Sequence, residues 1–439
     1  MNTIRLSLYC KGATLAVLLI LTLMPFGESR GQNTDYVRKV VATLASPEMK
    51  GRGYVGGGDS IAASYIAGEY QRIGIKAIGD SYYQDFKVNV NTHPGELSLR
   101  INGVLLKPGR DYLLEGGSPT RAGRFETVSL RKSDLQMGDT WVSKVRGISN
   151  RVLMITEDAL PDIDKVQKAK VDGILKVLKY NEQVASAGVV IFTKDKLVHS
   201  PSPTLYPRPV FVVNRPIDPD TVREVSFSVE SIYRPGYPTR NVVGFLPGTA
   251  VPDTMIMITA HYDHLGMMGR NTYFPGANDN ASGVAMMLDL ARYFAANRPR
   301  YSVMFVAFAA EELGLGGSRH YVINPMYPLN RVKFLLNLDL EGTGDEGIQV
   351  VNATVHQNEF KRLFAINMRE GYLAQIKPRG EACNSDHCFF HQAGVKSFYI
   401  YTLGGAQAYH DIDDVPANLS LADYPDYFRL LTTFFEEMR

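Results

Sequence analysis

The sequence lacks the features that mark several specialised classes of protein. It has three cysteines and one tryptophan in 439 residues, and 47 basic side chains nearly balance 45 acidic ones. A chain so close to neutral gives no electrostatic reason to expect nucleic acid or an acidic membrane surface as a partner. Beyond the N-terminal segment there is no apolar run of the roughly 20 residues needed to cross a membrane. With 45% hydrophobic and 21% charged residues, the composition is that of an ordinary folded globular protein.

The N-terminal segment, residues 1–31, is typical of a secretory signal peptide. Arg5 and Lys11 give it a positive start, residues 13–26 form a short apolar stretch, and small residues precede Gln32 where cleavage is expected. We therefore expect a protein exported to the periplasm or the extracellular space and free of the membrane after cleavage. An uncleaved N-terminal anchor is the alternative.

Few cysteines would remain in the mature chain. Cys10 lies in the signal segment, which leaves Cys383 and Cys388. An exported protein meets oxidising conditions, so these two can form a disulfide, although their spacing alone does not establish one.

The length predicts two domains, or one catalytic domain that carries a large insertion. Residues 32–93 form the first part of the main domain, with amphipathic helices at 34–44 and 59–73 and an alternating strand at 82–90. The second helix ends at Gly74, as helices commonly do.

Residues 94–233 differ from the flanking sequence in their pattern of short strand-like pieces and turns, which predicts an inserted accessory domain. They contain strand-like pieces and one helical stretch, at residues 151–156, 187–193, 209–214 and 163–178, separated by proline-rich turns. Residues 233–240 are rich in proline and glycine, and we expect them to be a linker into the final part of the main domain, residues 234–439.

Apolar runs alternate with helical periods from residue 241 onward. The runs have the character of fully buried strands and lie at residues 242–245, 255–260, 302–309, 334–338 and 397–402. Helical spacing separates them at residues 282–297 and 358–371, and Ser420 is expected to open a last helix. This alternation predicts an α/β fold whose mostly parallel central sheet has helices on both faces.

Unusual polar residues follow these runs, at the sheet edge where such folds bind ligands. They are His261, Glu311, Glu312, Asp339, Tyr409 and His410, and Asp279 precedes a helix in the same region. Several carboxylates at one edge would repel each other and raise each other's pKa unless a cation compensates. Imidazole nitrogen and carboxylate oxygen are zinc ligands. Three ligand carboxylates and one hydroxide would balance two divalent ions, which favours a dinuclear site.

Each ligand then takes a position in the predicted two-zinc centre. Asp279 bridges both metals, His261 and Asp339 complete one of them, and Glu312 and His410 complete the other. Two metals about 3.5–4 Å apart can polarise a carbonyl and generate hydroxide at neutral pH, which are the two requirements of peptide hydrolysis.

The neighbouring residues have supporting roles in this prediction. Glu311 is left over next to a ligand and is the candidate general base, which later protonates the leaving amine. Asp263 is positioned to fix the tautomer of His261. Tyr409 is the candidate donor to the oxyanion of the tetrahedral intermediate, with a packed aromatic ring as the alternative. His264 has no assignable partner and is interpreted as structural or solvated.

The chain resembles the M28 family of zinc peptidases. The motifs that carry the resemblance are His261-Tyr262-Asp263-His264-Leu265-Gly266, residues 276–283, Glu311-Glu312-Leu313-Gly314-Leu315, Asn337-Leu338-Asp339, Ser385-Asp386-His387 and Tyr409-His410-Asp411, with Met49-Lys50-Gly51-Arg52-Gly53 near the start. The resemblance implies a three-layer α/β/α fold, the five zinc ligands and base named above, and Asp386 as a residue that supports them. It also implies that the insertion is similar to a protease-associated domain.

The sequence therefore predicts a secreted zinc aminopeptidase that hydrolyses N-terminal residues from peptides, with a metal-bound hydroxide as nucleophile and Glu311 as base. A carboxypeptidase or dipeptidase of the same family remains open. A glutaminyl cyclase would need only one zinc, so the presence of both His261 and Asp339 argues against it. The intact Glu311 argues against a non-catalytic, peptidase-like binding ectodomain.

Overall fold

The computed structural model describes residues 33–136, 140–156 and 164–438. The predicted signal segment lies outside the described residues. Among the described helices, none combines the length and the apolar character that a membrane crossing requires.

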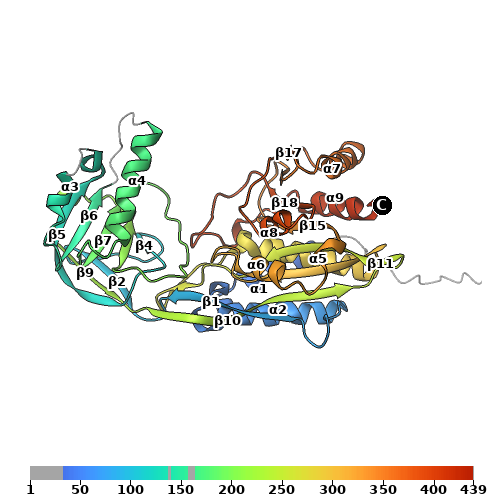
Figure 1. The fold of residues 1–439 in the computed structure, drawn as a ribbon, viewed down its shortest axis with the longest axis horizontal. Coiled ribbons are helices and arrows are strands. Elements are labelled where there is room, and N and C mark those ends of the chain that lie inside the picture. The colour runs from blue at the N-terminus through green and yellow to red at the C-terminus, as the bar shows by residue number, and fades with distance from the viewer. Residues whose placement is uncertain (1–32, 137–139, 157–163, 439) are drawn as a thin grey trace, which may run out of the picture. The chain divides into compact units, whose positions relative to one another are not determined.

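A mixed eight-stranded sheet forms the centre of the main body, in the order β1-β10-β14-β11-β15-β18-β16-β17. The neighbours β14, β11, β15 and β18 run parallel, and antiparallel strands flank them (Figure 1). The strands are β1 (Tyr83–Thr92), β10 (Ile232–Leu246), β11 (Val251–His261), β14 (Tyr301–Phe308), β15 (Val332–Leu338), β16 (Ile348–Val351), β17 (Ile376–Pro378) and β18 (Ser397–Thr402).

Alternate residues of the central strands face two different helical layers. In β11, Ile256 and Ile258 belong to the larger hydrophobic core, whereas Met255 and Met257 belong to the core on the other face. The larger core takes in α1 (Thr34–Leu44), α2 (Gly58–Ile73), α5 (Gly283–Ala296), α7 (Gln357–Glu370) and α9 (Tyr424–Glu436). The other core takes in α6 (Gly316–Ile323) and α8 (His387–Gln392). Burial on both faces explains why these strands are continuous apolar runs in the sequence.

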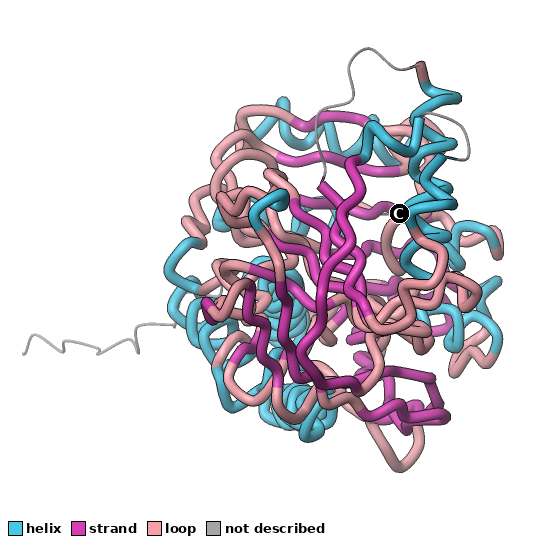
Figure 2. The backbone as a smooth tube through the Cα atoms, turned by 90° about the vertical axis from the view of Figure 1, so that its left-hand side faces the viewer, coloured by secondary structure: helices cyan, strands magenta, loops and turns pink. Residues whose placement is uncertain are grey.

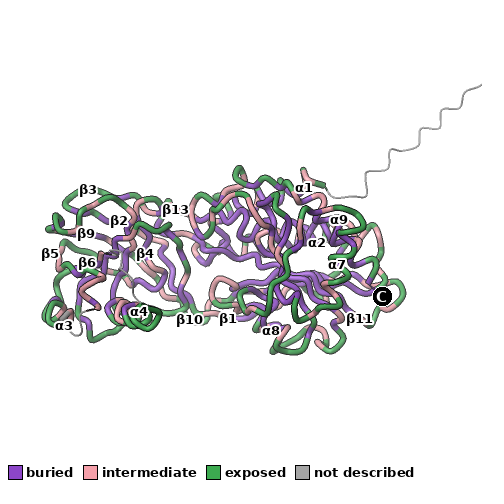
Figure 3. Tube along the Cα trace, turned by 90° about the horizontal axis from the view of Figure 1, so that it is seen from above, coloured by how far each residue is buried: buried purple, intermediate pink, exposed green. Residues whose placement is uncertain are grey.

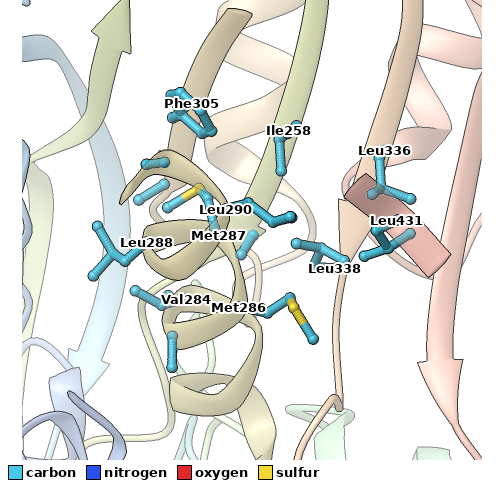
Figure 4. Packing of buried hydrophobic residues seen from close by; sticks show 14 of the residues in the cluster. Ile258, Val284, Met286, Met287, Leu288, Leu290, Phe305, Leu336, Leu338 and Leu431 are labelled. Atoms are coloured by element: carbon cyan, nitrogen blue, oxygen red, sulfur yellow. The ribbon is translucent and has the colours of Figure 1, made fainter. Parts of the chain in front are cut away.

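Helix α5 is deeply buried in the larger core. Met286, Met287 and Leu290 have no exposed surface, and Figure 4 shows them among strand residues such as Ile258 and Leu338. Figure 2 looks from the side of the inserted residues and shows strands in the middle of the view, with helices toward its periphery. Close packing around α5 fixes the position of the turn that precedes it, which carries Asp279.

A second eight-stranded sheet is built by the inserted residues, in the order β3-β2-β9-β5-β6-β7-β8-β4. Its elements are β2 (Leu97–Ile101), β3 (Val104–Leu105), β4 (Tyr112–Leu114), β5 (Arg121–Arg131), α3 (Thr140–Lys144), β6 (Arg151–Thr156), α4 (Lys165–Tyr180), β7 (Gly188–Phe192), β8 (Val210–Val213) and β9 (Glu224–Val229). One face packs against α4, and the other packs against Leu265, Met268 and Phe274 of the main body. Figure 3 shows buried strands in both sheets. The predicted α/β fold class with an inserted accessory domain is confirmed.

Short elements complete the chain. They are the hairpin β12 (Met267–Met268) and β13 (Thr272–Tyr273), the single-turn helices η1 (Pro47–Arg52), η2 (Val55–Gly57), η3 (Lys132–Gln136), η4 (Pro219–Thr221), η6 (Leu329–Arg331) and η7 (Pro416–Asn418), and the π-helical turn η5 (Ala277–Ser282).

The predicted linker at residues 233–240 is wrong, because these residues form the first half of the long strand β10. They pair with β1, with a register shift between Val88 and Val90. Only residues 242–246 of β10 also pair with β14. Residues 233–240 therefore have no partner strand among the described residues on the side opposite β1. The missing N–H groups of Pro235 and Pro238 interrupt no backbone hydrogen bonds on that side.

The last helix also begins later than predicted. Asp423 is the N-cap residue of α9, and the hydroxyl of Ser420 accepts the N–H of Ala422 in a local turn instead of capping a helix.

Candidate metal centre

The carboxyl edge of the central sheet brings the predicted metal ligands together. The ligands extend from the last residue of β11, the loops after β14, β15 and β18, and the turn η5, in the order His261, Glu312, Asp339, His410 and Asp279. Parallel strands end at the same edge, so residues far apart in sequence become neighbours there.

Asp279 lies between the two predicted ligand histidines. Its Oδ1 is 3.3 Å from His261 Nε2, and its Oδ2 is 3.0 Å from His410 Nε2. One carboxylate oxygen faces each imidazole, which is the arrangement a bridging ligand requires.

The remaining predicted ligands complete the two sides of this bridge. His261 Nε2 lies 3.4 Å from Asp339 Oδ1, and His410 Nε2 lies 3.2 Å from Glu312 Oε2. His261, Asp279 and Asp339 offer ligand atoms within 4.8 Å of one another, and so do His264, Asp279 and Glu312.

The donor set fits divalent cations. Among the described residues, neither lysine nor arginine forms an ion pair with Asp279, Glu312 or Asp339. Buried carboxylates are costly without a compensating charge, and imidazole with carboxylate is a zinc-binding combination. The site can therefore hold metal in two overlapping groups that share Asp279.

Hydrogen bonds fix the tautomer of both predicted ligand histidines. His261 Nδ1 lies 3.1 Å from the carbonyl oxygen of Asp263, and His410 Nδ1 lies 2.9 Å from the carbonyl oxygen of His199. A proton on each Nδ1 leaves each Nε2 free to bind metal. His199 lies in the loop between β7 and β8, so the inserted residues orient one predicted ligand of the main body.

Asp263 was predicted to fix the tautomer of His261, without specifying the atom. In the structure its backbone carbonyl makes this contact. Its carboxylate lies 3.9 Å from His261 Nδ1 and accepts the N–H groups of Glu311 at 3.0 Å and Glu312 at 3.4 Å. Asp263 therefore fixes the turn that presents both glutamates to the site.

Glu311 lines the same cavity as His261, Asp279, Asp339 and His410. Burial raises the pKa of its carboxyl well above the usual range. Burial also raises the pKa of Asp386, to about 7. Because zinc would bind the neighbouring carboxylates, a bound cation is the natural means of keeping Glu311 ionised.

Tyr409 stacks on the imidazole of His410, with ring centroids 4.0 Å apart. It is 44% exposed and lines the cavity. Burial of the hydroxyl raises the pKa of Tyr409, so this group keeps its proton at neutral pH and can act as a hydrogen-bond donor.

The sequence interpretation missed the role of His264. This side chain is fully buried, and its Nδ1 lies 2.8 Å from Glu312 Oε1, so it is a partner of a predicted ligand and not a solvated residue. Its position three residues after His261 was the available signal, but only the fold shows that it faces Glu312.

A second missed feature is a chain of hydrogen bonds that orients Asp339. Thr259 Oγ1 donates to Asn337 Oδ1 at 2.8 Å, and Asn337 Nδ2 donates to Ser385 Oγ at 2.8 Å. The hydroxyl of Ser385 then donates to Asp339 Oδ2 at 2.7 Å. A carboxylate held on one oxygen presents the other to a metal.

Arg52 is a third missed residue. It is fully buried, and its guanidinium donates to the backbone carbonyls of Leu44, Tyr262, Pro275, Gly276 and Asp279. Burial lowers the pKa of Arg52 to about 10, so it remains charged at neutral pH. The opposite side of the same turn is held by Asp414, whose carboxylate accepts the N–H groups of Asn278 and Asp279.

Three residues at or beside the predicted ligands have a strained backbone. Ala310, Leu340 and His410 have φ values of 58°, 66° and 54°, in the left-handed region that residues other than glycine rarely adopt. Ala310 precedes Glu311, Leu340 follows Asp339, and His410 is itself a predicted ligand. Strain of this kind persists where the surrounding structure holds it, commonly at functional sites.

A disulfide joins Cys383 and Cys388, which the sequence allowed but did not establish. The bridge closes the loop that contains Ser385 and Asp386 and leads into α8. It therefore restrains the residue that donates to Asp339.

Residues 241–434 match the sequence model of peptidase family M28. Aminopeptidase YwaD of Bacillus subtilis is 27% identical over 328 residues, which cover 72% of this chain and 67% of that protein. A probable zinc metalloprotease of Pyricularia oryzae is 40% identical over 111 residues, which are 24% of this chain and only 22% of that protein. The solved structure of BSAP, a zinc aminopeptidase from Bacillus subtilis, superposes with a TM-score of 0.67 at 20% identity and covers 93% of this chain and 95% of that one.

The shared fold places the buried histidine and carboxylate cluster inside the region that the family model matches. The motif order, the sequence match and the arrangement of the cluster agree with one another. Residues 241–434, which carry the cluster, therefore form a domain of peptidase family M28.

Proposed function

We propose that this chain is a two-zinc aminopeptidase that removes single residues from the N-termini of peptides. The observation that carries the proposal is the position of Asp279, which faces the free Nε2 atoms of His261 and His410 with one oxygen each. The family assignment supplies the class of reaction, and the names of the relatives YwaD and BSAP favour the amino end of the substrate.

Zinc bound at the centre would polarise the scissile carbonyl and lower the pKa of a water molecule. The chain's own residues supply the proton transfers and the orientation. Glu311 accepts the proton of the attacking water and returns it to the leaving amine. The hydroxyl of Tyr409 donates a hydrogen bond to the oxygen on which negative charge develops. Asp263 holds the backbone of Glu311 in place during both proton transfers.

Metal analysis combined with a substrate panel tests this proposal. We expect elemental analysis of the purified chain to find two zinc ions per molecule, and we expect cleavage of aminoacyl anilides and free-amine peptides. The same peptides blocked by acetylation of the amine should remain intact. Cleavage of blocked peptides, or full activity with less than one metal per chain, would contradict the proposal.

A further inference from the structure

The cavity at the predicted metal centre is lined by one positively charged side chain, Arg379, that has no role in the proposed reaction. Its volume is about 310 Å³, and Arg379 and Tyr401 line it together with His261, Asp339 and Glu311. Arg379 directly follows β17, and its Nη1 donates to the hydroxyl of Tyr401 at 3.2 Å. Arg379 and the predicted metal ligands therefore line the same cavity.

Arg379 has no acidic partner within the described residues. The nearest acidic residue in sequence, Glu381, lies instead against His391 at 3.5 Å. The exposed Arg369, by comparison, pairs with Glu370 and Glu437. A guanidinium has five N–H donors, and the single bond to Tyr401 leaves a planar pair free to bind a carboxylate.

The backbone holds Arg379 in this position. Its N–H donates to the carbonyl of Val350 at 2.8 Å, and its own carbonyl accepts the N–H of Thr354 at 3.5 Å. The residue is therefore tied to β16, the strand that lies between the edge strand β17 and β18. Its side chain is exposed, so a ligand can reach it without unfolding the loop.

The volume of the cavity limits the size of a ligand that can reach Arg379. At about 310 Å³ it is at the small end of ligand sites, which suits one or two residues and not a long peptide. When the scissile carbonyl lies at the metal centre, only a group a few bonds away can reach Arg379.

We propose that Arg379, with Tyr401, is a carboxylate-binding subsite that directs this peptidase toward short peptides with a negative charge close to the scissile bond. The inference rests on the proposed aminopeptidase function. The carboxylate comes either from the C-terminus of a dipeptide or from an acidic side chain in the second position. Both present the same two oxygens to the guanidinium.

Four leucyl substrates assayed with the zinc-loaded chain test the proposal and separate the two sources. Leu-Gly against Leu-Gly-amide isolates the terminal carboxylate, and Leu-Glu-amide against Leu-Gln-amide isolates the side-chain carboxylate. We expect kcat/KM to be about 10-fold higher for at least one charged member over its uncharged partner, mainly through KM, as a charge-assisted pair would give.

Arg379→Met should remove this preference and leave kcat for Leu-Gly-amide unchanged. Tyr401→Phe should weaken it by a smaller factor, because the guanidinium loses only one restraint. Lys377→Met is the matched control, since Lys377 is an exposed cation of β17 that does not line the cavity, and it should keep the wild-type preference.

Equal kcat/KM values within both pairs for the wild-type chain would overturn the subsite. An equal loss on all four substrates in Arg379→Met would also overturn it, since that pattern indicates a structural role. Leucine anilide serves as the reference for the reaction itself. If the wild-type chain cleaves neither the anilide nor any of the four substrates, the proposed function fails and the subsite fails with it, whereas anilide cleavage without a charge preference refutes the subsite alone.

Discussion

Glu311 is the side chain on which the proposed chemistry depends most directly. In the proposed centre it is not needed as a ligand, because His261, Asp279, Glu312, Asp339 and His410 would supply the metal-binding atoms. Glu311→Gln keeps the shape of the side chain and removes its ability to accept a proton. We expect this variant to bind two zinc ions and to lose at least about 100-fold in kcat, the scale of a general base.

Steady-state kinetics and elemental analysis on the same preparation check this prediction. Glu182→Gln makes the same chemical change at an exposed residue outside the site and should leave both quantities unchanged. Near wild-type activity in Glu311→Gln would assign the proton transfers to another group.

Arg52 makes a prediction about metal affinity from outside the ligand set. Arg52→Met would leave up to five backbone carbonyls without their donor, including that of Asp279. Each unsatisfied buried group costs about 1–3 kcal/mol, so we expect the free energy of unfolding to fall by at least about 3 kcal/mol. Zinc affinity should fall about 10- to 100-fold, as when residues that support ligands are removed.

Arg208 provides a matched control for this experiment. It is also buried, and it donates to the carbonyls of Leu178, Lys179 and Asn181 at the C-terminal end of α4 in the insertion. Arg208→Met should lower stability in urea unfolding but leave the zinc affinity of the folded chain unchanged. If Arg52→Met binds zinc as tightly as Arg208→Met, Arg52 supports the fold and not the turn that carries Asp279.

At the level of elements, Asp289 connects three helices and predicts a pH dependence. Its carboxylate, in α5, accepts the N–H of Asn33 before α1 and the hydroxyl of Tyr424 in α9. Burial raises its pKa from 3.8 to about 6. The folded state therefore binds the proton of Asp289 more tightly than the unfolded state does. The protonated carboxyl thus adds to the free energy of unfolding below about pH 4, and this contribution is lost as the pH rises through 6.

Asp289→Asn removes this titration. The difference in unfolding free energy between the wild-type chain and this variant should shift against the wild type by up to about 3 kcal/mol between pH 4 and pH 7. Urea unfolding at a series of pH values measures it. A difference that stays constant over this range would mean that Asp289 keeps its ordinary pKa in the folded chain.

The elements that the sequence predicted well are those whose burial leaves a local pattern. The strands β11, β14, β15 and β18 are covered on both faces, so each is a continuous apolar run. The first half of β10 has one unpaired side and contains prolines and glycine, so local rules assign it to a linker. Its strand character comes from pairing with β1, which lies well over a hundred residues earlier in the sequence.

The same distinction applies to the site. His261 and Asp339 lie where apolar runs end, so the sequence itself marks them. The contact of His264 with Glu312 joins residues 48 positions apart, and Arg52 reaches carbonyls more than 200 positions away. No local pattern encodes such contacts, because they depend on which loops the sheet order makes neighbours.

At the scale of the whole molecule, the N-terminal segment predicts export with cleavage before Gln32. Mass spectrometry of the chain recovered outside the cytoplasm should find Gln32 as its first residue. It should also find Cys383 and Cys388 resistant to alkylation before reduction, as the disulfide requires. Recovery of the chain with residues 1–31 attached, in the membrane fraction, would favour the anchored alternative.

The hydrogen bond from His410 to the carbonyl of His199 has a consequence for protein engineering. Two peptidases of this kind could not be recombined by exchanging their insertions at the obvious sequence junctions, because the transplanted loop must present a carbonyl oxygen to an imidazole it did not evolve with. A viable chimera would exchange the loop containing His199, between β7 and β8, and the loop containing His410 as one unit. Hybrids that exchange only one of them should bind zinc less tightly on the side of His410 and Glu312.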